Sequence, residues 1–205
     1  MDKSKITIDK IKSVFKTKEY SFFENDSKNY NLNIFGVRSS DMTPNAFNDC
    51  VCLAWKFKGV WNLKVYDATT DPGLFYLEKP MNVNGTAIMV PGQYSKCYEV
   101  GLHKGYTALR QVKPMKYYRD TDRDKSFDLT GKIYEEIGFT DIHHASETGK
   151  SSVVANWSAG CNVIADIKDW KEFIGICQES VKVFGNSFTY TLINESDIDN
   201  VKILA

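Results

Sequence analysis

The stretch from Asp141 to Ile164, DIHHASETGKSSVVANWSAGCNVI, holds two of the three histidines of the chain and one of its five cysteines. His143 follows a short β-like run, and Cys161 follows a polar loop and a series of small residues. A thiol becomes a nucleophile when a neighbouring imidazole takes its proton, so these residues on facing strands would form a catalytic pair. Gly160 would let the backbone approach a substrate carbonyl, and nearby amides would hold an oxyanion. The alternative interpretation of Cys161 is a small buried hydrophobic side chain.

Three carboxylates precede His143 closely enough to orient its imidazole, as the third member of a catalytic triad does. Glu135 and Glu136 lie a few residues upstream, and Asp141 is two residues away, on the same face of a straight strand. A backbone carbonyl would serve the same purpose, so the sequence leaves the orienting group open.

The same stretch resembles the catalytic domain of the L,D-transpeptidases, on the residues Ile142-His143-His144-Ala145, a loop, and Ser158-Ala159-Gly160-Cys161. In that family a His followed by Gly-Thr precedes a loop and a Ser-His-Gly-Cys segment, with an Arg two residues after the Cys. Here His144-Ala145 replaces Gly-Thr, Ala159 replaces the second His, and Val163 stands at the position of the Arg. The chain also resembles bacteriophage-borne proteins with this His and WSxGC signature, which implies a phage or prophage origin.

The resemblance implies a cysteine peptidase or transpeptidase that transfers acyl groups of peptidoglycan stem peptides. It would act as an L,D-carboxypeptidase, endopeptidase or transpeptidase, and in a phage setting as a lysin. The implied residues fall into two groups: Cys161, His143, Ser158 and Gly160 for catalysis, and His144, Trp157 and His103 for substrate binding. His103 lies between a strand and a turn, where bonding a backbone carbonyl is the alternative role. This chemistry requires no cofactor.

The departures from the family pattern support an alternative function, a non-catalytic cell-wall-binding or virion-associated structural module on the same fold.

Charge and composition exclude several other classes. Lys plus Arg equals Asp plus Glu, so the formal net charge is zero, which removes the usual electrostatic case for nucleic-acid binding. No apolar run approaches the length needed to span a membrane, and the charged N-terminus, MDKSKITIDKIKSVFK, lacks the apolar core of a signal peptide. Five cysteines without repeated spacing argue against a disulfide framework. We therefore expect cytoplasmic synthesis without a signal peptide, followed by action at the cell wall if the protein is a phage lysin or virion component.

Periodicity predicts a mainly β (α+β) fold. Apolar residues at helical spacing predict an N-terminal amphipathic helix from Ile8 to about Lys18, with Thr7 as its cap. Short β-like runs then alternate with Gly or Pro turns, at residues 31–38, 50–57, 61–66 and 94–102. A helix begins at Asp166 and ends at Gly185, followed by a strand over residues 187–193. The pattern predicts a sandwich or barrel. The resemblance specifies an L,D-transpeptidase-like β-sandwich, with an N-terminal helical appendage (1–25), a single catalytic domain (26–205) and one helix after the cysteine.

A second stretch, YYRDTDRDKSFD from Tyr117 to Asp128, carries alternating acids. Hard cations need several oxygens that converge from a tight loop, and the first half of an EF-hand loop has this spacing. The predicted calcium ligands are Asp120, Asp122, Asp124 and Asp128. Lys125 takes the usual place of a Gly and Gly131 that of the bidentate acid. The alternative is therefore a solvated charged turn in which arginines neutralise the acids.

Overall fold

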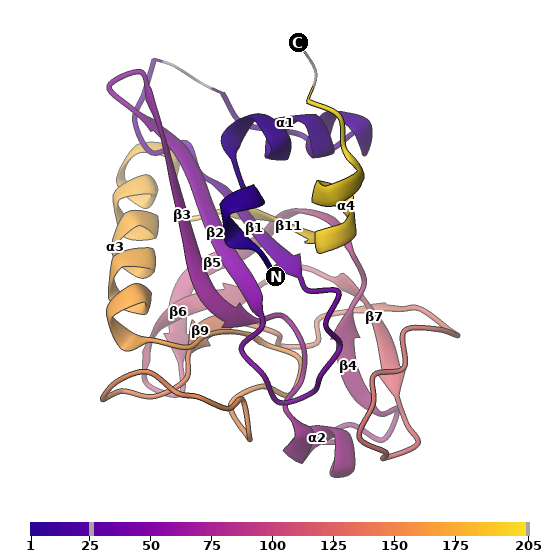
Figure 1. Cartoon of the computed structure of the whole chain (residues 1–205). Helices are drawn as coiled ribbons and strands as arrows, with labels where there is room; N and C mark the ends of the chain where they lie inside the picture. The colour runs from indigo at the N-terminus through magenta and orange to yellow at the C-terminus, as the bar shows by residue number, and fades with distance from the viewer. Residues whose placement is uncertain (25–26, 204–205) are drawn as a thin grey trace.

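The computed structural model describes residues 1–24 and 27–203 (Figure 1). Strands hold 35% and helices 21% of the residues, so the prediction of a mainly β fold is confirmed. In the described part, eight strands form a closed barrel in the order β1 (Asn33–Arg38), β11 (Phe188–Asn194), β5 (Gly92–His103), β6 (Tyr106–Gln111), β9 (Ile142–His144), β10 (Asn162–Ile164), β3 (Val60–Thr69) and β2 (Asp49–Phe57). Because the hydrogen bonding closes on itself, the two facing sheets of a sandwich are not confirmed.

Two three-residue strands close the barrel. β9 and β10 run parallel, with His143 opposite Val163, while β9 pairs with β6 and β10 pairs antiparallel with β3. Side chains alternate between the two faces of a strand. Ile142 and Ile164 therefore join the main core, and His143 faces the other side together with Val163.

A smaller antiparallel sheet lies beside the barrel, in the order β4 (Thr86–Met89), β7 (Met115–Asp120) and β8 (Tyr134–Glu136). Its apolar side chains belong to the same core cluster as those of the barrel. Buried hydrogen bonds through Thr140 also link the two sheets. The hydroxyl of Tyr98, in β5 of the barrel, donates to the carbonyl of Thr140 at 2.7 Å, and the hydroxyl of Tyr117, in β7 of the small sheet, lies 2.6 Å from Oγ1 of Thr140.

The N-terminal segment packs on the barrel surface. A short 3-10 helix, η1 (Lys3–Lys5), precedes α1 (Ile8–Thr17), whose first turn is capped by Thr7 as predicted. One side of α1 is buried against outward-facing residues of β1, β2 and β11, and its members are Ile11, Val14 and Phe15. The predicted boundary between appendage and domain, at residues 25 and 26, lies outside the described residues.

Three helices follow α1. α2 (Leu74–Glu78) precedes β4, and α3 (Ile167–Phe184) begins after its cap Asp166 and ends before Gly185, as predicted. The sequence predicted one helix after Cys161, whereas the structure has two, because α4 (Glu195–Asn200) follows β11 directly. A capping box from Asn194 to Asp197 stabilises α4, and burial of Ile198 beside α1 anchors it. Among the described residues, no helix is long and apolar enough to cross a membrane.

The packing of α1 predicts the effect of truncating its largest buried side chain. Phe15 is almost fully buried and contacts Phe35 of β1 edge-to-face, so Phe15→Ala should lower the free energy of unfolding by about 3–5 kcal/mol. Urea denaturation measures this loss, and the exposed Lys16→Ala variant of the same helix should change stability by less than about 0.5 kcal/mol. A loss below about 1 kcal/mol for Phe15→Ala would show that α1 unfolds separately from the barrel, as an appendage would.

Candidate active site

The paired strands β9 and β10 place His143 and Cys161 on the same outer face of the barrel. Cys161 directly precedes β10, and the amide of Asn162 donates to the carbonyl of Asp141 at 3.0 Å, so the parallel ladder extends to this point. Cys161 is two residues before Val163, which pairs with His143. With ordinary strand spacing, the Cα atoms of His143 and Cys161 are then about 8 Å apart, on the same face of the ladder.

Both side chains line one cavity of about 400 Å³. Its walls come from the end of β5, from β4 and β7 of the small sheet, and from the segments 136–140 and 156–161. Phe139 and Trp157 lie at its rim and remain 67% and 40% exposed. A cleft of this size, with an apolar rim and a few convergent polar groups, is suited to a small ligand or a short peptide segment.

His143 is held in one tautomer by the backbone. Its Nδ1 lies 2.8 Å from the carbonyl oxygen of His144. A carbonyl only accepts hydrogen bonds, so Nδ1 carries the proton and the neutral ring offers Nε2 as a base. The orienting group that the sequence left open among three carboxylates and a carbonyl is therefore a carbonyl.

Asp141 orients a different histidine. Its Oδ2 lies 2.7 Å from Nδ1 of His103 and 2.8 Å from Nε of Arg110, and its Oδ1 accepts the amide of Gln111 at 2.9 Å. The His103 ring in turn stacks on the His143 ring, with 4.4 Å between centroids and 12° between planes. Asp141 thus contacts His103 and not the His143 ring, and the two stacked rings both line the cavity.

The reactive groups are both neutral in the resting site. Burial, followed by the neighbouring His103, lowers the pKa of His143 to about 3. Burial, followed by the charge of Asp141, raises the pKa of the Cys161 thiol to about 12. The thiol donates weakly to the carbonyl of Phe139 at 3.7 Å, so the site holds a thiol and a neutral imidazole and no thiolate–imidazolium pair.

Ser158 and Gly160 shape the turn that presents Cys161. The fully buried Ser158 hydroxyl donates to the carbonyl of Cys161 at 2.8 Å and accepts the amide of Gly160 at 3.1 Å. Because Ser158 occupies the Gly160 amide, the predicted oxyanion role of that amide is not available in this conformation. Gly160 has φ +121°, and a Cβ there would meet the carbonyl oxygen of Ala87 at 2.7 Å. The absence of a side chain at Gly160 thus permits close contact with β4. The sequence had instead suggested that this glycine lets the backbone approach a substrate.

The three predicted substrate-binding residues separate into two groups. His103 and Trp157 line the cavity. His144 does not, because alternation along β9 turns it to the other face, where its ring lies 4.2 Å from that of Tyr106 and 5.8 Å from that of Trp170. Its placement is that of a core histidine between the barrel and α3.

Lys104, Arg119 and Phe139 are among the cavity residues that sequence reasoning missed. Arg119 was expected to neutralise the neighbouring acids, but its guanidinium pairs with Glu136 and donates to the carbonyl of Gly85 at 2.9 Å. Phe139 and Lys104 adopt positive φ angles of 55° and 48°, which place them at turns over the cavity. The signal available in the sequence was the occurrence of charged and aromatic residues beside the turn Lys104-Gly105. Only the folded chain shows that such residues, together with Arg119 and Phe139, line one cavity.

No protein-family model, curated protein or solved structure matches this chain. The site is therefore interpreted from its own geometry.

The burial of the cysteines predicts where and how fast the chain is alkylated. All five cysteines are free and buried, but among them Cys161 lines the described cavity, so iodoacetamide should modify it first. With a thiol pKa of about 12, the rate should rise roughly tenfold per pH unit from pH 6 to 9. Peptide mass spectrometry follows each site. A rate that levels off below pH 7 would instead reveal a thiolate–imidazolium pair.

The stacked histidines predict a shift in the pKa of His143. Because His103 helps to hold this pKa low, His103→Gln should raise it. Imidazole proton resonances titrated over the pH range in which the protein stays folded measure the change. Lys104→Gln, on the same hairpin, is the matched control and should leave the His143 resonances in place. An unchanged pKa in His103→Gln would mean that burial alone lowers it.

Proposed function

We propose that this protein is a cysteine-dependent acyl-transfer enzyme that acts on peptide carbonyls, with Cys161 as nucleophile and His143 as general base. The observation that carries the proposal is the placement of both side chains on one face of adjacent strands, lining the same cavity. Burial alone would accommodate a structural cysteine, but it does not explain why a histidine with its Nδ1 held by a backbone carbonyl lines the same cavity.

The chemistry follows from the neutral resting pair. The Cys161 sulfur attacks the carbonyl carbon as its proton passes to Nε2 of His143, and the carbonyl electrons move to oxygen. When the tetrahedral species collapses, the C–N bond breaks and the imidazolium returns the proton to the departing amine, which leaves a thioester. Water, in a peptidase, or an amine, in a transpeptidase, then attacks the thioester as its proton passes to Nε2 of His143. The C–S bond breaks, the imidazolium returns the proton to the Cys161 sulfur, and an acid or a new amide is released. Each acyl transfer ends with His143 neutral again.

The surroundings of the pair supply positioning. The carbonyl of His144 holds the tautomer of His143, and His103 fixes the plane of the ring by stacking. Ser158 holds the turn that presents the thiol. We assign the catalytic role to Cys161 and His143, and positioning roles to Ser158 and His103.

The substrate class in this proposal is the peptidoglycan stem peptide, as the L,D-transpeptidase resemblance implies. The occurrence of His and Cys on neighbouring strands supports the resemblance, since that family carries its base and nucleophile in this way. A stem peptide bears carboxylates, and Lys104, which lines the cavity, would bind one of them in place of the family's Arg, whose position Val163 occupies. Within this proposal the fold is a divergent form of the L,D-transpeptidase sandwich, and the protein acts at the cell wall as a phage lysin or virion component.

One observation favours the second candidate, a non-catalytic cell-wall-binding or virion-associated module. Burial makes both His143 and Cys161 neutral and opposes ion-pair formation. A module of this kind would bind wall peptides in the cavity without forming a thioester.

The deciding experiment incubates the wild-type protein and its Cys161→Ala variant with defined muropeptides and follows the products by mass spectrometry. Release or exchange of a stem-peptide residue is expected for the wild type and should be lost in Cys161→Ala, while His143→Gln should lower the rate by about 10²–10⁴-fold. Cys50→Ala removes a buried thiol outside the cavity and should retain activity. Equal binding of muropeptides by wild type and Cys161→Ala, without any product, would overturn the enzyme in favour of the binding module.

A further inference from the structure

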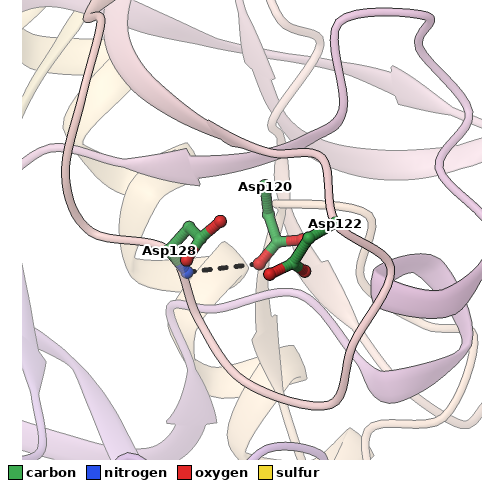
Figure 2. A group of neighbouring side chains, drawn as sticks. All are labelled: Asp120, Asp122 and Asp128. Carbon is green, nitrogen blue, oxygen red and sulfur yellow. Dashed lines mark hydrogen bonds between the residues drawn. The ribbon is translucent and has the colours of Figure 1, made fainter.

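The end of β7 gathers three carboxylates that the acyl-transfer proposal does not use. Asp120 is the last residue of β7, and the loop after it returns to bring Asp122 and Asp128 beside it (Figure 2). One carboxylate oxygen of each residue lies within 4.8 Å of the others. Ca²⁺–oxygen distances are about 2.3–2.6 Å, so the three oxygens are close enough for a single ion to contact all of them with a small adjustment of the side chains.

Asp120 is the buried residue of the three, and one of its carboxylate oxygens has no hydrogen-bond partner in the described part of the chain. Asp120 is fully buried, and its Oδ2 accepts the amide of Asp128 at 3.2 Å. Its Oδ1 is buried with no hydrogen-bond partner among the residues that the structure describes. Figure 2 shows this carboxylate between Asp122 and Asp128, so the unpartnered oxygen belongs to the acidic group. An unsatisfied buried carboxylate oxygen is costly, and a cation relieves that cost.

The acids also lack a protein counter-charge. Within residues 1–24 and 27–203, none of the three carboxylates forms an ion pair with Lys or Arg. The adjacent Arg119 is engaged by Glu136 and the carbonyl of Gly85, on the side of the cavity. The alternative of a turn in which arginines neutralise the acids is therefore not what the described contacts show.

We propose that Asp120, Asp122 and Asp128 bind one Ca²⁺ ion, with water and backbone oxygens completing the coordination. Calcium fits better than magnesium because a loop with ligands at irregular spacing tolerates six to eight oxygens in flexible geometry, whereas magnesium demands a near-ideal octahedron. The sequence also predicted Asp124 as a ligand. Its Oδ1 instead accepts the amide of Ser126 at 2.6 Å and the Ser126 hydroxyl at 2.7 Å, and it is outside the group.

A Ca²⁺ ion bound by these carboxylates would stabilise one wall of the cavity that His143 and Cys161 line. Asp120 pairs with Thr86 across the sheet, and its neighbour Arg119 holds the carbonyl of Gly85. Thr86, Gly85 and Arg119 all line the cavity. An ion that fixes the end of β7 therefore stabilises the small sheet at the point where it borders His143 and Cys161. The inference does not depend on the acyl-transfer proposal, because binding is measured on the protein alone.

The test is thermal unfolding of the full chain with CaCl₂ and with a chelator, together with calorimetric titration of Ca²⁺. We expect a Kd on the order of 10⁻⁵ to 10⁻³ M. At a Ca²⁺ concentration 100-fold above Kd, the Tm should rise by roughly 5–10 °C. Absence of binding heat and of a Tm shift at 10-fold the upper Kd, about 10 mM, would overturn the site.

Variants separate this site from unspecific binding. Asp122→Asn replaces an exposed ligand, so the variant should fold normally and bind Ca²⁺ at least tenfold more weakly. Asp124→Asn, two residues further along the same loop, is the matched control and should bind like the wild type. Equal affinity of the wild type and both variants would overturn the proposed ligands. An equal Tm shift with MgCl₂ at the same concentration would overturn the assignment to calcium.

Discussion

The barrel is closed by the parallel pairing of β9 and β10, two strands of three residues each. Their inward side chains, Ile142 and Ile164, belong to the main core, so burial of apolar surface holds this short ladder in register. The same register turns His143 and Cys161 outward to one face. A shift of the register by one residue would turn both side chains into the barrel core. The position of the site on the outer face therefore depends on the packing of that core.

Exclusion of water governs the chemistry of that site. Burial raises the thiol pKa of Cys161 and lowers the imidazole pKa of His143, so both groups rest in their neutral forms. The remaining polar groups are tied to fixed partners, as Asp141 is to His103 and Ser158 is to the turn before the thiol. Low dielectric strengthens these contacts and limits rearrangement. The side chains around His143 and Cys161 are thus held in one arrangement, which is the property that the proposed acyl transfer requires.

Local patterns predicted much of the architecture. The apolar spacing of α1 and α3 and their caps, Thr7 and Asp166, placed both helices, and the turn Lys58-Gly59, with both φ angles positive, joins β2 to β3 as the sequence indicated. The helix α4 was missed because its six residues are mostly polar and carry a single buried side chain. The strand rhythm left a sandwich and a barrel open. It did not decide between them because β9 and β10 are too short to show a period, and their neighbours β6 and β3 lie far away in the chain.

The sequence by itself determined the residues of the candidate pair, since His143 and Cys161 are the residue types that acyl transfer needs and lie within one short stretch of the chain. It also determined the acids after β7, because their spacing within one loop is local. Only the tertiary structure decided that Asp141 supports His103, that His144 is a core residue, and that Asp124 is outside the acidic group. The physical reason is that these contacts join strands and loops whose proximity results from burial of the shared core, which no local pattern records.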